Sequence, residues 1–330
     1  MKVLITGANG FVGSHILDRL RADGVAVAVL LRGTSDTLFI EGHLDSVDVH
    51  YGSLADPGSI RRAMEDASHV IHCAGKTKAA RAREYYEVNR QGTRHVVEAV
   101  NKAAAGPGSI SRLLLISSLA ATGPATALTP VREDAHPAPV SHYGRSKLEA
   151  EEEVREGSQV EFTILRPSAV YGPSDRDLLS IFKAVRAHLR PLIGGGQQPL
   201  SLLYVGDLAA AVVECLTRPE AAGGTYNVAS PEVVTSGALA REIAELMGAW
   251  TVPLPLPTAA LWPVCLALHV AGLVSGKPHI LNLQKYREIR APGWVCDVAR
   301  LREEIGFVAP TSLQQGLAET IRWYRHMGWL

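Results

Sequence analysis

The chain has 330 residues, in which 33 Lys and Arg balance 33 Asp and Glu and hydrophobic residues make up 47%. The balanced charge argues against a nucleic-acid partner, and 4 cysteines without a C-x-x-C pair argue against a disulfide framework or a metal site. We therefore expect a cytoplasmic globular protein with two domains, or with one domain and a large addition.

Short apolar runs and amphipathic stretches alternate through the first half of the chain. Continuous apolar strands that alternate with helices predict a parallel sheet covered on both faces. The fold class is then α/β, a doubly wound Rossmann-type sheet whose ligand crevice lies at the carboxyl ends of the strands. Strands are predicted at Lys2–Thr6, Val25–Leu31, Val47–Tyr51, His69–Cys73, Leu113–Ser117 and Val160–Leu165, and helices at Phe11–Ala22, Pro57–Ala67, Glu84–Ala104 and Ser141–Glu156.

The stretch TGANGFVG, residues 6–13, places Gly7, Gly10 and Gly13 three apart between the first predicted strand and the first predicted helix. Glycine lets the backbone turn tightly and approach a pyrophosphate, whose charge the free N–H groups of a helix N-terminus receive. A plain strand-to-helix turn seldom needs three glycines. The spacing therefore predicts a dinucleotide site.

The rhythm changes after about Tyr171, where Pro- and Gly-rich breaks separate shorter elements. We predict a dinucleotide-binding domain of residues 1–171, to which residues 200–230 return. Residues 172–199 and 231–330 form a smaller, interleaved, mostly helical substrate-binding lobe. Helices are predicted at Asp177–Leu189, Asp207–Thr217, Ser236–Met247 and Thr311–His326, with short strands near Leu200–Tyr204 and Gly224–Val228.

One segment of the second half, AALWPVCLALHVAGLVS at residues 259–275, is nearly all apolar. It is short for a bilayer span, and Pro263 and His269 interrupt it. We predict a buried or pocket-lining helix, with peripheral membrane contact as the alternative.

The glycine spacing resembles that of the extended branch of the short-chain dehydrogenase/reductase superfamily, the NAD-dependent epimerases and dehydratases. Further motifs follow in the order of that family: YGSLAD (51–56), VIHCAG (70–75), VNRQGT (88–93), LISS (115–118), YGRSK (143–147) and LRPSAVYGP (165–173). Ser53 stands where the family usually has aspartate. The resemblance spans roughly residues 1–175, and it implies a homodimer formed through helices 84–104 and 141–156.

The same resemblance implies which residues bind the cofactor. Asn89 has a second interpretation, because it either joins an active-site water network or braces the backbone. The implied cofactor-binding residues are Thr6, Gly7, Asn9, Gly10, Phe11, Val12, Gly13, Arg32, Ser53, Leu54, Cys73, Ala74, Gly75, Asn89, Tyr143, Lys147, Pro167, Ser168 and Val170.

Tyr143 and Lys147 are the central pair of the predicted catalytic set, four residues apart on one helix face. A tyrosine hydroxyl has a pKa of about 10, and a nearby ammonium is expected to lower it toward neutrality. Such a pair can move a proton at a carbonyl oxygen while hydride moves to or from a nicotinamide. The resemblance adds that Lys147 holds the ribose hydroxyls.

Ser118 is expected to hydrogen-bond the reacting oxygen, whereas Ser117 is interpreted as a cap of the strand end. Three histidines invite a catalytic or metal-binding interpretation. They lack ligand spacing, so we expect each to be hydrogen-bonded or solvated rather than catalytic. These are His72, His136 and His142.

The stretch VLLRGTSD bears on the choice of cofactor. Leu31 stands where an acid that binds the ribose 2′-hydroxyl of NAD is expected, and Arg32 follows it. Arginine suits a 2′-phosphate, so NADP(H) is favoured over NAD(H). The alternative is an arginine stacked on adenine in an NAD enzyme.

Two features favour a hydrophobic substrate. Sugar-nucleotide members of the family usually carry an arginine shortly before the Y-V-x-D-L-A element, and here Leu200 takes its place. The stretch KYREIRAPGWVCD from Lys285 resembles the tail of bacterial proteins similar to the 3β-hydroxysteroid dehydrogenases.

We therefore predict an NAD(P)(H)-dependent oxidoreductase acting on a hydroxyl or keto group of a sterol- or lipid-like substrate. A nucleotide-sugar epimerase or dehydratase is the alternative enzyme. A non-catalytic nucleotide-binding protein is a further alternative, and the set of Ser118, Tyr143 and Lys147 speaks against it.

Overall fold

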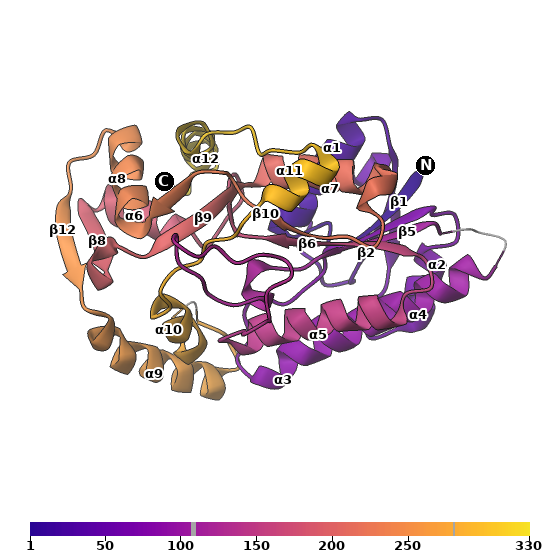
Figure 1. Ribbon diagram of the computed structural model, residues 1–330, viewed down its shortest axis with the longest axis horizontal. Helices are drawn as coiled ribbons and strands as arrows, with labels where there is room; N and C mark the ends of the chain where they lie inside the picture. Colours follow the sequence, from indigo (N-terminus) through magenta and orange to yellow (C-terminus); the bar gives the residue numbers. More distant parts are fainter. Residues whose placement is uncertain (107–109, 280) are drawn as a thin grey trace.

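A seven-stranded parallel sheet organises the computed structural model, which describes residues 1–106, 110–279 and 281–330 (Figure 1). The strand order β10-β6-β5-β4-β1-β2-β3 is that of a doubly wound sheet, and every neighbouring pair is parallel. The predicted α/β class is confirmed. The strands are β1 (Lys2–Thr6), β2 (Ala26–Leu31), β3 (Asp48–Tyr51), β4 (His69–His72), β5 (Arg112–Ile116), β6 (Glu161–Pro167) and β10 (Thr225–Val228).

Helices cover both faces of this sheet because its strands are apolar on both sides. In β1, Val3 and Ile5 belong to one core cluster and Leu4 to the other, and all three are fully buried. The first face carries α1 (Phe11–Ala22), α7 (Val205–Thr217) and α11 (Ala299–Ile305), and the second carries α2 (Pro57–Ala63), α4 (Gly92–Ala104) and α5 (His142–Gly157).

The helix predicted at Glu84–Ala104 has a more complex structure. It consists of α3 (Ala82–Tyr85), a π-helical segment η2 (Tyr86–Gln91) and α4. A π-helical segment widens the turn and is often found at functional sites. Here it carries Asn89 into the buried space between β4 and α5.

The smaller lobe surrounds its own core, in which Phe182 and Tyr324 are fully buried. It has a three-stranded sheet β11-β9-β7 and a parallel pair β12-β8. Its elements are β7 (Ala169–Tyr171), α6 (Leu179–Arg186), β8 (Leu189–Ile193), β9 (Pro199–Tyr204), β11 (Val233–Thr235), α8 (Ser236–Met247), β12 (Val252–Leu256), α9 (Thr258–Ser275), α10 (Leu283–Ile289) and α12 (Leu313–His326). Gly194–Gly196 is a short 3₁₀ turn of this lobe, and further 3₁₀ turns lie outside it at Glu41–Ser46, Leu119–Ala121 and Pro219–Ala221.

The two parts interleave, and the placement of single elements differs from the domain prediction. Within residues 200–230, β10 pairs with β6 in the large sheet and α7 packs on that sheet, whereas β9 pairs with β7 and β11 in the small sheet. Helix α11, expected in the substrate lobe, packs with Leu301 and Ile305 into the core of the large sheet. It contacts β10 and the short turn Pro219–Ala221.

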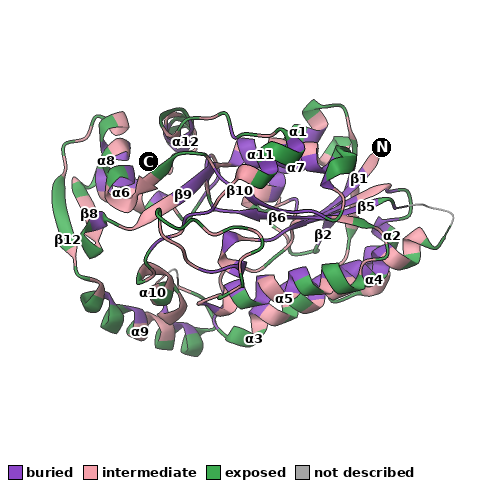
Figure 2. Ribbon diagram, viewed as in Figure 1, coloured by how far each residue is buried: buried purple, intermediate pink, exposed green. Residues whose placement is uncertain are grey.

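Helix α9 departs from the predicted burial. Only Leu261, Cys265 and Gly272 are buried, while His269 and Leu273 line a cavity. Most of its remaining surface is exposed, and Figure 2 shows it largely green. Of the predicted buried or pocket-lining helix, burial is therefore wrong for most of its length, whereas His269 and Leu273 do line a pocket. An apolar run predicts that contact of its side chains with water is unfavourable. It does not predict whether protein, lipid or a partner covers them.

Candidate active site

The glycine turn between β1 and α1 is held too closely for side chains. Gly7 has a φ of +78°, and a Cβ on it would lie 2.6 Å from the Ala74 backbone. A Cβ on Gly13 would lie 2.0 Å from the Gly7 carbonyl oxygen. Gly10 caps α1 without a side-chain hydrogen bond, so the N–H groups of the first turn face the crevice. This cradle fits a pyrophosphate, which the dipole of α1 would also attract.

The ends of the neighbouring parallel strands meet at the same edge. Thr6 is in register with His72, and the Ala74 N–H donates to Thr6 Oγ1 at 3.4 Å. A Cβ on Gly75 would lie 3.8 Å from Lys147 Nζ, which brings the end of β4 to helix α5. The residues predicted after β1 and β4 thus lie together at one edge of the sheet. Those on the β3 side, Ser53 and Leu54, form a turn in which Ser53 Oγ accepts from the Ala55 N–H.

Arg32 directly follows β2, the strand next to β1. Thr6 and Leu30 are paired in register, so Arg32 lies at the same sheet edge as the glycine turn. Its side chain is exposed, whereas Leu31 is buried. The Asn9 side chain donates to the Asp36 carbonyl oxygen at 3.0 Å and ties the loop after β2 to the glycine turn.

Helix α5 carries Tyr143 and Lys147 and begins at a serine cap. Ser141 Oγ accepts from the Gly144 N–H, which fixes the first turn. Lys147 lies one turn further on, and its ammonium donates to the Ile116 carbonyl oxygen at 2.6 Å. The catalytic helix is thereby attached to the carboxyl end of β5.

The two serines that follow β5 have different partners. Ser117 is buried and donates to Glu151 Oε1 at 2.5 Å. Ser118 is the partner of Tyr143, and its hydroxyl also accepts from the Ala120 N–H. This division supports the choice of Ser118 over Ser117, although Ser117 bonds a buried carboxylate and does not cap the strand.

The pKa values of the pair depart from the expectation. The pKa of Tyr143 is raised to about 12, mainly by burial. The hydrogen bond with Ser118 lowers this pKa, whereas the carboxylate charge of Glu288 raises it. The expected lowering of the Tyr143 pKa by Lys147 is therefore not what this arrangement produces. The reason is desolvation, which disfavours the phenolate. The same effect lowers the pKa of Lys147 to about 8, so a neutral amine is accessible near physiological pH.

Behind this pair lies a buried charge network that the sequence analysis missed. Arg166 donates to both carboxylate oxygens of Glu151, with Nη2 to Oε2 at 2.7 Å, and Arg155 donates to the same Oε2. Burial alone would raise the pKa of Glu151, but the hydrogen bonds and charge of Arg166 outweigh it and the pKa is lowered. The signal in the sequence was a glutamate one turn beyond Lys147 and an arginine before Pro167.

Asn89 makes the hydrogen bonds of a brace. Its Oδ1 accepts from the Lys76 N–H at 2.7 Å, and its Nδ2 donates to the Lys76 carbonyl oxygen and to Ser146 Oγ. Ser168, at the end of β6, has a buried hydroxyl without a partner in the described part of the chain. An unpaired hydroxyl at this edge fits a polar group of a bound cofactor, and Pro167 and Val170 flank it.

The histidines are explained without catalysis. His72 is buried between Thr6 Oγ1 at 2.7 Å and Thr93 Oγ1 at 2.9 Å. His142 bonds the Tyr86 hydroxyl, and His136 is exposed. Among the described residues no cluster of His, Cys, Asp and Glu has the geometry of a metal site.

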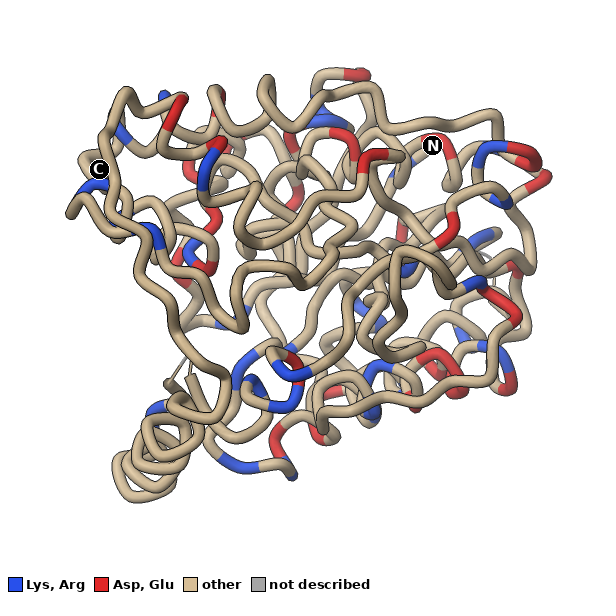
Figure 3. The backbone as a smooth tube through the Cα atoms, turned by 60° about the vertical axis from the view of Figure 1, so that its left-hand side comes forward, with Lys and Arg blue, Asp and Glu red and all other residues tan. Residues whose placement is uncertain are grey.

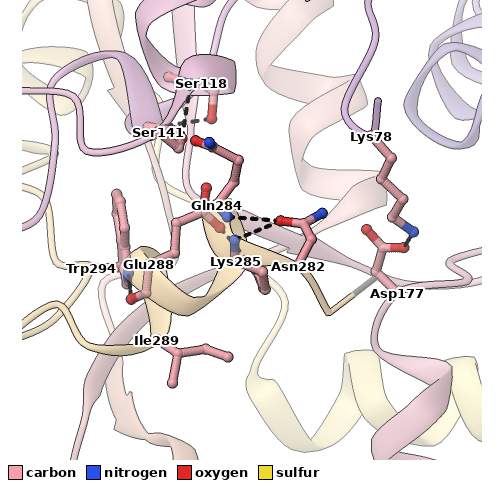
Figure 4. Close-up of polar contacts among 12 residues, drawn as sticks. Lys78, Ser118, Ser141, Asp177, Asn282, Gln284, Lys285, Glu288, Ile289 and Trp294 are labelled. Carbon is pink, nitrogen blue, oxygen red and sulfur yellow. Dashed lines mark hydrogen bonds and ion pairs between the residues drawn. The ribbon is translucent and has the colours of Figure 1, made fainter. Parts of the chain in front are cut away.

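Helix α10 closes the site from the small lobe, and the sequence analysis did not assign it this role. Asn282 caps it by accepting from the N–H groups of Gln284 and Lys285, and Gln284 Oε1 in turn accepts from the His142 N–H at the start of α5. Figure 4 shows the Gln284 side chain extending from α10 toward Ser141 and Ser118. The charge of Glu288 then acts on Tyr143.

The sequence of this chain is similar to those of known proteins of similar length. The model of the NAD dependent epimerase/dehydratase family matches residues 3–229. A ceramide reductase of Caulobacter vibrioides is 30% identical over 99% of this chain and 96% of its own. A UDP-glucose 4-epimerase of Vibrio cholerae is 28% identical over 96% and 94%, and a sterol demethylase protein B of Methylococcus capsulatus is 27% identical over 99% and 99%.

A solved structure shows the same fold. The UDP-glucose 4-epimerase of Thermus thermophilus in complex with NAD superposes with a TM-score of 0.78 at 24% identity, over 98% of this chain and 99% of that one.

Proposed function

The chain belongs to the NAD dependent epimerase/dehydratase family, and from this premise we propose that it is an NAD(P)(H)-dependent oxidoreductase acting on a hydroxyl or keto group of a hydrophobic, sterol- or lipid-like molecule. At the coarser level it is an enzyme of the extended short-chain dehydrogenase/reductase type with a small-molecule substrate, and NAD(P) is the cofactor typical of the family. The observation that carries the proposal is the convergence of Ser118, Tyr143 and Lys147 beside the glycine turn.

The three side chains have separate tasks in this mechanism. Bound NAD(P)(H) would supply or accept the hydride. Tyr143, protonated at neutral pH because its pKa is about 12, donates its proton to the carbonyl oxygen of the substrate. Ser118 hydrogen-bonds the same oxygen and holds it in place. Lys147, with a pKa of about 8, exchanges protons near neutral pH and can hold the ribose hydroxyls.

The protonation state of Tyr143 decides for which direction of the reversible reaction the free enzyme is prepared. A phenol that burial keeps protonated is ready to act as an acid, which suits reduction of a ketone. Oxidation of an alcohol requires the phenolate, which burial disfavours. We therefore propose reduction as the favoured direction. The ceramide reductase named above is a reductase by its name and supports this choice.

The hydrophobic nature of the substrate rests on Leu200 and on two relatives. Leu200 pairs with Val234 in the small sheet and packs against the lobe core, so this position offers no cation to a diphosphate. The ceramide reductase and the sterol demethylase protein B are named for lipid substrates. A sugar-nucleotide epimerase is the second candidate, supported by the Vibrio cholerae relative.

For the cofactor we propose NADP(H). Arg32 is exposed at the end of β2, beside the glycine turn, and Leu31 is buried, so neither of these positions carries an acid for a ribose 2′-hydroxyl. Titration of the protein with NADPH and NADH, followed by fluorescence, measures the preference. Arg32→Ala is expected to weaken the binding of NADPH more than the binding of NADH. An equal loss of affinity for both cofactors would contradict the assignment.

Turnover experiments test the function itself. The protein is incubated with NADPH and a panel of sterol ketones and long-chain β-keto compounds, and in parallel with UDP- and dTDP-sugars. Reduction of a hydrophobic ketone is the expected result, and conversion of a sugar nucleotide alone would favour the second candidate. Tyr143→Phe is expected to lower kcat about 10²- to 10⁴-fold. Tyr86→Phe is the matched control, because its hydroxyl bonds His142 and lies outside the catalytic set.

Two further expectations remain proposals. We propose a homodimer through α4 and α5, which pack against each other and are joined by Arg94 and Glu153; sedimentation at micromolar concentration measures this, and a monomer would contradict it. We also propose a cytoplasmic location.

A further inference from the structure

Helix α9 exposes an apolar surface at the edge of the small lobe. Among the described residues it is a helix long and apolar enough to cross a membrane by length and composition, with a mean hydropathy of 1.7, yet only 17% of it is buried. Its large exposed side chains are Trp262, Val264, Val270, Leu273 and Val274. A patch of this kind marks a contact with a partner or a membrane.

The structure argues that α9 lies on a membrane rather than across it. Its 18 residues reach about 27 Å at 1.5 Å per residue, slightly less than the hydrocarbon core. Both flanks are anchored on the same protein body, since β12 pairs with β8 in the small lobe and α10 binds, through Gln284, the start of α5 on the large sheet. A span would place those flanks on opposite sides of the bilayer.

Cations surround this uncharged helix. Residues 258–275 contain no Lys, Arg, Asp or Glu. The chain that follows, up to residue 290, carries four exposed cations, Lys277, Lys285, Arg287 and Arg290, against the single acid Glu288. Figure 3 shows α9 as the tan coil at the lower left, with blue segments beside it. An apolar surface next to basic residues complements an anionic lipid bilayer.

A cavity beside α9 is lined in part by Tyr85, a neighbour of Tyr143. It has a volume of about 220 Å³, and His269 and Leu273 of α9 line one side while Tyr85 and His142 line the other. The Tyr85 ring lies 6.2 Å from the Tyr143 ring, centroid to centroid. The cavity thus reaches within one aromatic layer of the catalytic phenol.

We propose that α9 and its neighbouring cations dock the protein on an anionic bilayer, and that the cavity behind α9 admits the lipid-like substrate from that bilayer. The second part rests on the proposed function. A second copy of the chain is a poorer occupant of this surface, because two such faces would bring like charges together. Delivery from the bilayer would also keep an apolar substrate out of water.

Vesicle flotation tests the docking and needs no substrate. The full chain, saturated with NADPH, is floated with phosphatidylcholine vesicles that contain or lack 30% phosphatidylglycerol, at low and high salt. Val274→Glu is expected to lower binding at least tenfold, and the control Val308→Glu, an exposed valine beyond α11, to leave it unchanged. Arg287→Gln/Arg290→Gln is expected to lower binding about fivefold per cation. Arg61→Gln/Arg62→Gln on α2 is the control of equal charge.

Fluorescence locates the contact. Brominated lipids are expected to quench part of the tryptophan emission, and Trp262→Phe is expected to remove that part. Absence of flotation with anionic vesicles, or equal effects of Val274→Glu and Val308→Glu, would overturn the docking. So would a dimer in solution that Val274→Glu dissociates while the wild type does not float.

Turnover separates the route from the function. Leu273→Trp narrows the cavity and is expected to slow reduction of a long-chain β-keto ester in vesicles at least tenfold relative to a short, soluble β-keto ester. Because Leu273 is also 41% exposed, both rates are compared at lipid concentrations where flotation shows the variant and the wild type equally bound. An equal rate for wild type and variant on vesicles, or an equal loss with both esters, would overturn the route. If the protein floats with vesicles but reduces no hydrophobic ketone, the proposed function and the substrate route are both wrong. The membrane docking would still be supported.

Discussion

The catalytic half and helix α9 depart from simple burial in opposite directions. Around α5 the protein buries charged and polar groups, among them Lys147, Glu151 and Arg166. In α9 it exposes apolar ones, such as Trp262 and Val274. The buried charges are paired or hydrogen-bonded at short distances, while the exposed apolar groups lie beside cations. Departures from the burial rule therefore mark the places where function is expected.

The largest expected effect is in the buried network. Glu151→Ala leaves Arg166 buried without its carboxylate, and breaking such a pair costs about 3–5 kcal/mol of the free energy of unfolding. Urea denaturation measures the loss. The adjacent Glu152 is exposed, so Glu152→Ala is expected to change stability by about 0.5 kcal/mol at most. Similar losses for the two variants would mean that the network adds nothing beyond a surface charge.

The second effect depends on pH. His72 is buried, and burial lowers its pKa from 6.5 to about 3. Because the folded pKa lies below the unfolded one, the unfolded chain takes up the proton first as the pH falls. The stability from neutral His72 is present above pH 6.5 and is lost toward pH 3. Between pH 7 and pH 5 the loss is about 2 kcal/mol.

Urea denaturation across this range, on the wild type and on His72→Asn, isolates the contribution. The difference in stability between the two proteins is expected to shrink as the pH falls, because asparagine does not titrate. A difference that stays constant from pH 7 to pH 5 would show that the pKa of His72 is the same in the folded protein as in the unfolded chain, and would contradict the lowering by burial.

The third effect concerns the glycine turn. Gly13→Ala places a methyl group 2.0 Å from the Gly7 carbonyl oxygen, so the turn must open. We expect a loss of about 1–3 kcal/mol in stability and weaker binding of NADPH. Gly42→Ala is the control, because a Cβ there meets nothing within 4 Å. Unchanged NADPH affinity in Gly13→Ala would separate the turn from the cofactor site.

The smallest effect is expected in α9. Val274 is 85% exposed, so Val274→Ser is expected to change the free energy of unfolding by about 0.5 kcal/mol at most. In the same helix, Leu261 is 9% exposed, and Leu261→Ala is expected to cost about 2 kcal/mol or more. Thermal or urea unfolding of both variants measures the contrast. A large loss in Val274→Ser would mean that α9 is covered in solution.

Much of the fold follows from the periodicity of the sequence. Strands such as β1 and helices such as α1 and α8 match their predicted bounds, because a continuous apolar run predicts a strand buried on both faces and a period of 3.6 predicts a helix. The π-helical segment Tyr86–Gln91 could not be predicted in this way. It is stabilised by contacts of Asn89 with residues 13 and 57 positions away.

The candidate site shows the same division. Motif spacing is enough to name Ser118, Tyr143 and Lys147, and the structure brings them to one sheet edge. Motif spacing does not reveal Gln284 and Glu288, which act on the start of α5 and on Tyr143 from more than 140 positions away in the sequence. It also misled on the pKa of Tyr143, because desolvation depends on everything packed around the phenol.

The sequence by itself determined the doubly wound sheet and the glycine turn and predicted the catalytic groups, because short motifs and the pattern of apolar residues encode them. The tertiary structure alone decided which charges are buried together, which lobe residues approach Tyr143, and that α9 faces outward. Those properties depend on contacts between distant segments, and free energies of burial arise only when such segments meet.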